Sequence, residues 1–414
     1  MELSPALPSI AYSGLRNSPG APLDSPRKQL PALQTPLEVH PAIPFNRPSF
    51  FGREMEYIGE AMQRGHAAGD GFYTGCCQRL IEEATGTQKA LLTTSCTHAL
   101  EMCGLLLELQ AGDEVIVPSF TFVTTANAFA LRGAKIVFAD ICPDTLNIDP
   151  ACIAALITPR TKAIVVVHYA GVACSMDAIV PLAAGIPLIE DNAHGLFGKY
   201  RGRQLGTFGA LATQSFHETK NLSCGEGGAL LINDPRFNEA AEIIREKGTD
   251  RSRFLRGQVD KYTWTGLGSS YVMSDLLAAI LYGQLESREE IAAMRRRVWH
   301  AYQEGLAGWA RENGVKLPHV PPECEQTHHM FYLILPSLAC RQALIAHLRA
   351  RSILSVFHYQ SLHCSPAGLN FGGRPGQCPV TENVSDRLLR LPFYNGLAQS
   401  DQARVIEAVL DFRG

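Results

Sequence analysis

Short apolar runs of strand length alternate with stretches of helical periodicity over most of the chain, and this alternation restricts the fold more than any other feature. In residues 97–109, for example, apolar side chains recur at i, i+3 and i+4, as on one face of a helix. Continuous Val, Ile and Leu strands separated by helices are typical of a mainly parallel sheet that helices cover on both faces. We therefore predict an α/β fold whose ligands bind at the carboxyl ends of the strands. The predicted strands comprise residues 89–93, 114–117, 135–138, 164–167, 187–189, 212–216 and 229–232.

The chain is predicted to divide into three parts. Residues 1–42 are rich in Pro, Ser and Leu and lack any helical or strand period, which is typical of a flexible N-terminal extension. Residues 43–285 hold the alternating strands and helices and form the predicted large α/β domain. Residues 286–414 begin with a long charged helix and continue with two strands and two further helices, which predicts a small α+β C-terminal domain.

Composition and charge exclude several classes of protein. Of the 414 residues, 46% are hydrophobic and 19% are charged, which is typical of a soluble globular protein. The net charge of −3 gives no reason to expect nucleic acid or a membrane surface as a partner. The 12 cysteines form no CxxC pair, and His328 beside His329 has no evident third ligand, so we expect no metal site. No apolar run approaches the ~20 residues of a membrane span, and no signal peptide opens the chain, so we expect a cytoplasmic protein.

Two polar stretches follow predicted strands. Ser95 and Thr97 stand where a strand gives way to a helix, and exposed N–H groups at a helix start can bind a phosphate. Ser and Thr are also ordinary helix caps, and taken alone that explanation is the better one. Glu190 and Asp191 end a buried apolar strand, where a carboxylate could hold a protonated ring nitrogen. Taken alone, the alternative that Asp191 only caps the next helix is equally good.

An aromatic pair and a lysine follow two other strands. Phe120 and Phe122 reach a strand end, where a planar ring can stack on either, although an aromatic residue there is more often part of the core. The strand of residues 212–216 brings Ser215, His217 and Lys220 to the same edge of the sheet. A lysine in a cleft can lose its proton by desolvation and attack a carbonyl as a neutral amine. Considered alone, however, Lys220 is better explained as a solvated charge on the surface.

Taken together, the four stretches indicate a single binding site. A phosphate cradle, a stacking aromatic ring, a carboxylate for a ring nitrogen and a lysine that can form a Schiff base are the groups that pyridoxal 5′-phosphate needs. They follow one another at the strand ends where one site is expected. The sequence therefore predicts an enzyme with pyridoxal 5′-phosphate as its cofactor.

The chain also resembles the DegT/StrS family of pyridoxal-phosphate sugar aminotransferases from about residue 43 to its C-terminus. The resemblance rests on SCTHAL, PSFTFVTTANAF, EDNAHG, SFHETKN followed by GEGG, YVMSDLLAAI and VFHYQSLH. It implies fold type I, the aspartate aminotransferase architecture. The segments VHYAGVACSMD and REKGTDRSRFLRGQVDKYTW are most similar to the subgroup that makes dTDP-4-amino-4,6-dideoxygalactose.

The resemblance assigns a role to each matching residue. Lys220 fits the catalytic Schiff-base lysine, Asp191 fits the partner of the ring nitrogen, and His194 lies where a polar residue meets the ring hydroxyl. Phe122 matches the stacking aromatic residue. The expected phosphate ligands are Ser95, Cys96 through its backbone, Thr97 and Ser215.

Other positions extend the comparison or depart from it. Ser270 stands where many relatives have an asparagine that reaches the partner subunit's cofactor, so the resemblance implies a homodimer but leaves this contact open. His358 and His363 follow a predicted small-domain strand and could approach the sugar. The alternative is that both are capping or surface histidines.

The implied reaction transfers an amino group from L-glutamate to a dTDP-linked 4-keto-6-deoxy sugar, in the biosynthesis of a deoxyamino sugar for a cell-surface polysaccharide. Sugar 3-dehydrases of the family have a histidine in place of the lysine, so Lys220 argues against that activity. A 3-keto sugar nucleotide aminotransferase and an amino acid-cleaving pyridoxal enzyme remain as alternatives. A regulator that binds the cofactor without turnover is a further alternative, against which the retained Lys220 and Asp191 argue.

Overall fold

The computed structural model describes residues 41–50 and 52–413. The predicted flexible extension, residues 1–42, lies outside the described residues except for its last two positions. Residues 41–414 form one compact unit, so the division predicted at residues 285 and 286 stays a prediction. No helix in the described part of the chain is both long and apolar enough to cross a membrane.

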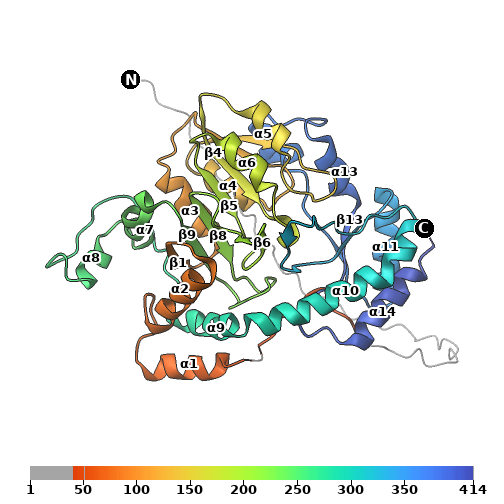
Figure 1. Cartoon of the computed structure of the whole chain (residues 1–414), viewed down its shortest axis with the longest axis horizontal. Helices are drawn as coiled ribbons and strands as arrows, with labels where there is room; N and C mark the ends of the chain where they lie inside the picture. The colour runs from red at the N-terminus through yellow and green to blue at the C-terminus, as the bar shows by residue number, and fades with distance from the viewer. Residues whose placement is uncertain (1–40, 51, 414) are drawn as a thin grey trace, which may run out of the picture. The chain divides into compact units, whose positions relative to one another are not determined.

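A seven-stranded sheet lies at the centre of this unit (Figure 1). Strands β8, β5, β4, β2 and β3 are parallel, and β9 runs antiparallel between β8 and β1. The predicted α/β fold with a mainly parallel sheet is thereby confirmed. In spatial order the strands are β1 (Lys89–Thr93), β9 (Gly228–Ile232), β8 (Leu211–Ser215), β5 (Leu188–Asp191), β4 (Thr161–Val167), β2 (Glu114–Pro118) and β3 (Lys135–Ala139).

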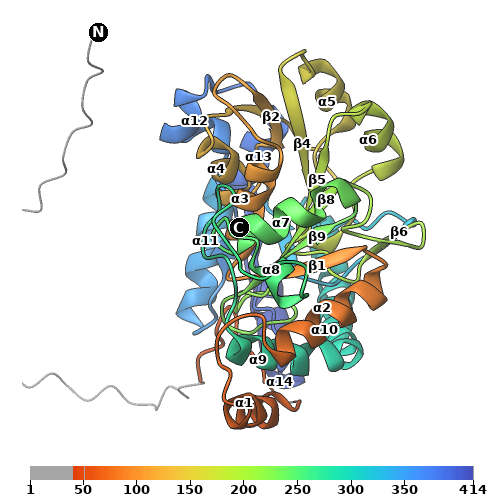
Figure 2. The ribbon, with the colours of Figure 1, turned by 90° about the vertical axis from the view of Figure 1, so that its left-hand side faces the viewer.

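Both faces of this sheet are buried, which explains why its strands are continuously apolar. In β1, Leu91 packs on one face of the sheet, in the core that this face forms with α3 (Cys96–Leu106) and α4 (Thr124–Ala130). Ala90 and Leu92 pack on the opposite face. Figure 2 shows α3 and α4 on one side of the strands and α5 and α6 on the other. The second face is covered by α2 (Phe72–Thr85), α9 (Asp275–Glu286), α5 (Pro150–Leu156) and α6 (Met176–Ala183).

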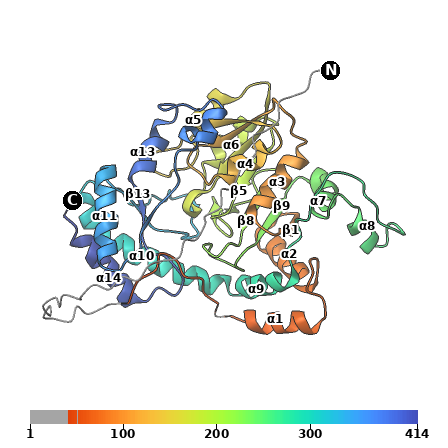
Figure 3. The ribbon, with the colours of Figure 1, turned by 180° about the vertical axis from the view of Figure 1, so that it is seen from behind.

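A second, antiparallel sheet has its own apolar core. Strand β13 (Leu388–Arg390) lies between β11 (Tyr332–Ile334) and β12 (Val356–Phe357). Helices α10 (Arg288–Glu312), α11 (Leu338–Ala350) and α14 (Gln399–Leu410) pack around this core, and Figure 3 shows them beside β13. Ile43, which the sequence places at the start of the large domain, packs in this second core and bridges to Ile353.

The remaining elements are short. Three two-residue strands form a small sheet beside the main one. These strands are β10 (Cys324–Glu325), β6 (Lys199–Tyr200) and β7 (Arg203–Gln204), and the other helices are α1 (Glu54–Gln63), α7 (Asn238–Arg245), α8 (Arg251–Leu255), α12 (Pro366–Asn370) and α13 (Pro379–Arg387).

Candidate active site

The strand ends of the large sheet bring most of the predicted groups to one edge. Asp191 is the last residue of β5, and Ser215 is the last residue of the adjacent β8. Lys220 follows Ser215 in a turn whose backbone is closed by a hydrogen bond from the Lys220 N–H to the His217 carbonyl at 2.9 Å. The predicted convergence of these residues is therefore observed.

The amine of Lys220 has no hydrogen bond or ion pair with any described residue, and the side chain is only partly accessible. Burial lowers the pKa of Lys220, while Cys96 and Asp191 oppose the shift and Arg390 adds to it. A lowered pKa increases the fraction of neutral amine at a given pH. Lys220 is therefore not the solvated charge that its sequence alone suggested, and a neutral lysine amine can act as a nucleophile.

Two hydrogen bonds hold the carboxylate of Asp191 beside Lys220, in the region around these strand ends that we call the pocket. Its Oδ2 accepts a hydrogen bond from Thr125 Oγ1 at 2.8 Å, and its Oδ1 accepts one from the Ala193 N–H at 3.2 Å. Thr125 is in turn bonded to Thr121 at 2.8 Å. Burial raises the pKa of Asp191, while the Thr125 hydrogen bond and the Lys220 charge act against the rise. A buried carboxylate of this kind gains from pairing with a cation, because the pair offsets its desolvation.

Its neighbour Glu190 has a structural role. Glu190 is fully buried and accepts hydrogen bonds from the N–H groups of Gly206, Phe208 and Gly209 at 2.6–2.8 Å. Its Oε2 also lies 2.9 Å from Nε2 of His168. The two carboxylates that end β5 therefore have separate tasks, since Glu190 fixes the loop beyond the strand and Asp191 faces the pocket.

An anion cradle forms where β1 leads into α3. Ser95 is the N-cap, and its Oγ accepts a hydrogen bond from the His98 N–H at 3.1 Å. The N–H groups of Cys96 and Thr97 belong to the first turn, where helical partners are absent. Gly228 of β9 lies between Thr93 and Ser215 in the sheet and directly below this turn.

Gly228 allows the cradle and the sheet to approach closely. A Cβ at this position would lie 2.3 Å from the Ser95 carbonyl carbon and 2.4 Å from the Cys96 nitrogen. Any side chain would therefore displace the backbone of the cradle. This packing gives the last glycine of the GEGG stretch a physical explanation. The cradle offers backbone N–H donors of the kind that bind a phosphate.

The two aromatic candidates differ in their surroundings. Phe120 is buried against Tyr169, with ring centroids 5.2 Å apart, and belongs to the core. Phe122 is 53% exposed, and its ring centroid lies 6.3 Å from that of Tyr359. Of the two, only Phe122 has a free face on which a planar ring could stack.

Three histidines line the pocket as neutral rings. His194 stacks on His329 with centroids 4.1 Å and planes 16° apart, and its centroid lies 6.4 Å from that of His358. Burial lowers the pKa of each of these three rings well below its usual value. His329 Nδ1 lies 2.8 Å from Oδ1 of Asn221, the residue next to Lys220. The sequence suggested no role for His329, and only its place in the fold connects it with the site.

The two histidines predicted near the sugar have different positions. His358 belongs to the pocket, with its Nδ1 2.7 Å from the Tyr169 hydroxyl. His363 is fully buried, and its ring nitrogens lie 2.6 Å from Ser119 Oγ and 2.9 Å from Glu382 Oε1. Because both nitrogens already have partners, His363 has none left to offer a substrate.

Arg390 of β13 lies near these residues as well, although no sequence pattern singled it out. Burial lowers the pKa of its guanidinium, and its charge acts on Lys220 and on His194, His329 and His358. Ser270 is exposed and forms an isolated bridge with Glu246. The contact between Ser270 and a partner subunit stays a prediction.

Comparison with known proteins places this geometry in context. The model of the DegT/DnrJ/EryC1/StrS aminotransferase family matches residues 51–410. The aminotransferase TlmJ from Streptoalloteichus hindustanus is 31% identical with a TM-score of 0.81, over 89% of this chain and 97% of that one. A DegT DnrJ EryC1 StrS aminotransferase from Brucella abortus is 30% identical with a TM-score of 0.79, over 87% and 95% of the two chains. Spr1654 from Streptococcus pneumoniae, in its PLP-form, is 25% identical with a TM-score of 0.82, over 89% and 97%.

Proposed function

The chain belongs to the DegT/DnrJ/EryC1/StrS aminotransferase family, and from this premise we propose that it transfers the amino group of L-glutamate to C4 of dTDP-4-keto-6-deoxyglucose. The product is dTDP-4-amino-4,6-dideoxygalactose. At the coarser level the protein is a sugar aminotransferase that depends on pyridoxal 5′-phosphate, the cofactor present in solved structures of similar proteins. The observation that carries the proposal is the amine of Lys220, which pairs with none of the described residues, beside the buried carboxylate of Asp191 at adjacent strand ends.

The side chains near Lys220 are of the kinds that this cofactor requires, which supports the proposal. The start of α3 with Ser95, Cys96 and Thr97, together with Ser215, would hold its phosphate. Phe122 would stack on its ring. When bound, the cofactor supplies an electron sink for charge that develops at the reacting carbon and carries the amino group between the two half-reactions.

Lys220 has two tasks in this mechanism. Its amine would hold the cofactor in the resting enzyme, and the lowered pKa favours the neutral amine that this task requires. After release, the same amine would accept the proton from the α-carbon of the amino donor and would give it up again to the carbon that bears the transferred amino group. Asp191 lies close enough for its charge to act on Lys220 and would keep the ring nitrogen protonated by ion pairing.

His194 would orient the cofactor through a hydrogen bond. Its Nδ1 accepts from the Ala170 N–H at 3.3 Å, which leaves the proton of the neutral ring on Nε2. The Nε2–H is thus available as a donor to the ring hydroxyl. His358, which is held by Tyr169, is the candidate for contact with the sugar.

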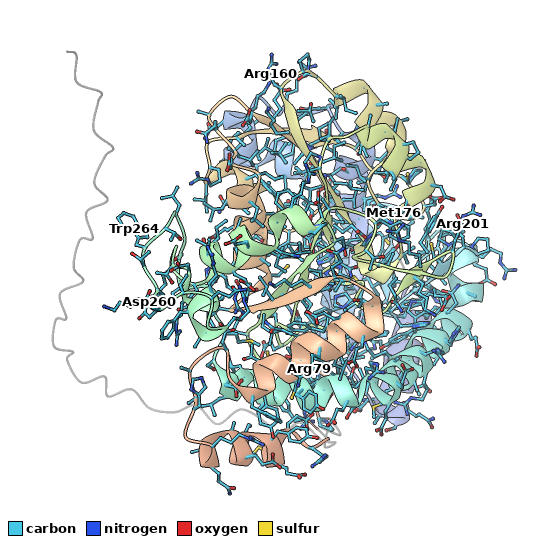
Figure 4. All side chains as sticks on the ribbon, turned by 60° about the vertical axis from the view of Figure 1, so that its left-hand side comes forward. Arg79, Arg160, Met176, Arg201, Asp260 and Trp264 are labelled. Atoms are coloured by element: carbon cyan, nitrogen blue, oxygen red, sulfur yellow. The ribbon has the colours of Figure 1, made fainter. Side chains whose placement is uncertain are left out.

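A homodimer is part of the proposal. The segment between α8 and α9 carries large apolar side chains in solvent: Trp264 is 77% exposed, Leu267 is 67% exposed and Tyr262 is 53% exposed. Figure 4 shows Trp264 on this segment. Isolated monomers rarely expose such a cluster. We propose that a second copy of the chain covers it, and that the enzyme works in the cytoplasm, where its product enters the synthesis of a cell-surface polysaccharide.

The decisive assay supplies dTDP-4-keto-6-deoxyglucose and L-glutamate and identifies the product by NMR. The proposal predicts an axial amine at C4. Turnover of a 3-keto isomer instead would replace the proposed substrate and leave the aminotransferase assignment in place. A Lys220→Ala protein that still aminates the sugar at the wild-type rate would refute the mechanism.

A further inference from the structure

Arg295 of α10 holds the turn that carries His329. Its side chain is buried, and its Nε donates to the His328 carbonyl at 3.1 Å while Nη2 donates to the His329 carbonyl. Its Nη1 donates to Oδ1 of Asn395 at 2.7 Å. No backbone N–H in the described part of the chain bonds either of the two carbonyls. Arg295 therefore supplies their hydrogen bonds and fixes the backbone just before β11.

A buried cation is a costly way to fill this space. Burial lowers the pKa of the Arg295 guanidinium to about 9, and none of the described carboxylates forms an ion pair with it. The Phe393 ring, whose centroid lies 4.8 Å from the guanidinium carbon, offsets only part of this cost. His328 adds to the cost, because its φ of 52° lies in the left-handed region that a residue with a Cβ rarely adopts. An apolar side chain would avoid the buried charge, but it could not donate to two consecutive carbonyls and so hold the turn.

The turn contacts His194 at two points. Thr327 Oγ1 donates to the His194 carbonyl at 2.6 Å, and the ring of His329 stacks on the ring of His194. The neutral ring of His329 donates through Nδ1 to Oδ1 of Asn221 at 2.8 Å, because an amide oxygen can only accept. Nδ2 of Asn221 donates in turn to the Thr327 carbonyl at 2.8 Å. The turn thus ties the residue that follows Lys220 to the ring of His194.

We propose that Arg295 is a positioning residue for the cofactor, which fixes the ring of His194 through the turn of residues 327–329. This inference rests on the role proposed for His194, a hydrogen bond to the ring hydroxyl of pyridoxal 5′-phosphate. Arg295 acts indirectly, since its three nitrogens already donate to oxygen atoms of the protein. Because His329 closes one face of the His194 ring, that ring cannot tilt toward this side, and its Nε2–H stays directed at the hydroxyl.

The test measures binding of pyridoxal 5′-phosphate by the apoenzyme, with neither amino donor nor sugar present. Arg295→Lys keeps the positive charge but replaces the fork of N–H donors by a single ammonium group. The affinity for the cofactor should fall about 3- to 10-fold, as expected for the loss of one hydrogen bond. The visible absorption band of the bound cofactor should shift, because it responds to the hydrogen bond at the ring hydroxyl. Arg297→Lys is the matched control: this exposed arginine of α10 donates to the Leu397 carbonyl at 2.9 Å, and its replacement should change neither quantity.

A double-mutant cycle shows whether Arg295 acts through His329. His329→Ala should reproduce the losses of Arg295→Lys, and the double variant should bind the cofactor no more than about twofold more weakly than His329→Ala alone. Fully additive losses would overturn the proposal. Asn395→Ala, which removes one acceptor from the guanidinium, is the milder form of the same perturbation if Arg295→Lys does not fold. It should shift the absorption band in the same direction, and an unshifted band would count against the proposal.

Urea unfolding separates positioning from a purely structural role. Lower stability of Arg295→Lys with wild-type cofactor affinity and an unshifted band would overturn the proposal. His194→Asn tests the role proposed for that ring on its own. A loss of affinity there that Arg295→Lys does not share would overturn this inference alone, whereas wild-type affinity in His194→Asn would refute both. Because no sugar is present, an error in the proposed sugar substrate leaves the result for Arg295 unchanged.

Discussion

Replacing Gly228 by alanine tests whether the close approach of β9 to the start of α3 builds the phosphate cradle. The added Cβ would lie 2.3–2.5 Å from three backbone atoms of Ser95 and Cys96. Backbone atoms cannot rotate away as a side chain can, so the turn itself has to move. Gly228 does not have a left-handed φ, and the effect of the substitution is therefore steric and not conformational.

The magnitude follows from this geometry. Overpacking costs about 1–3 kcal/mol, and we expect a loss near 3 kcal/mol in the free energy of unfolding because all three contacts are with backbone. If the shift breaks one or two charge-assisted hydrogen bonds to the phosphate, the affinity for pyridoxal 5′-phosphate should fall about 10- to 100-fold.

The assay is a titration of apoenzyme with pyridoxal 5′-phosphate, followed by absorbance, together with urea unfolding. Gly59→Ala is the matched control, because a Cβ there meets nothing within 4 Å and alanine favours the interior of α1 by about 1 kcal/mol. Wild-type cofactor affinity in Gly228→Ala would refute the account of the cradle, whatever happens to stability.

Three further predictions concern the pocket. Burial lowers the pKa of Lys220 below 10.5, the value for an ordinary lysine. The rate of cofactor binding by the apoenzyme, measured by stopped-flow absorbance, should therefore rise with pH and reach a plateau below pH 10.5. A plateau at or above that pH would contradict a buried amine. Thr125→Val removes one hydrogen bond from Asp191, so the pKa of Asp191 should rise, kcat should fall by about tenfold and stability by about 1 kcal/mol; unchanged kcat in steady-state assays would count against this role. Glu190→Gln places an amide N–H₂ among backbone N–H donors and should cost about 2–4 kcal/mol in urea unfolding, while a loss under 1 kcal/mol would show that Glu190 is dispensable.

The sequence was sufficient for the parts of the site that lie at the ends of buried strands. Asp191 ends β5 and Lys220 follows β8, and parallel pairing of these strands brings the two residues together without further information. The order of the apolar runs therefore predicted both the fold and the meeting of Asp191 and Lys220 at one edge of the sheet.

Other parts depend on packing that no local pattern reports. His358 and His363 are five residues apart, yet one faces the pocket and the other is enclosed by Ser119 and Glu382. Likewise, Phe120 is buried in the core, whereas Phe122, two residues later, is exposed. In the sequence Arg390 resembles any charged residue of a short strand, and only the pairing of β13 with β11 shows which face of the sheet it occupies.

The most direct test of the central claim is to locate the cofactor's covalent attachment. Holoenzyme is reduced with borohydride, digested and analysed by mass spectrometry. The account predicts one modified peptide, with the pyridoxyl group on Lys220, and none after prior incubation with excess L-glutamate, which displaces the lysine. Attachment at another lysine, or none at all in yellow enzyme, would contradict the assignment of this pocket as the active site.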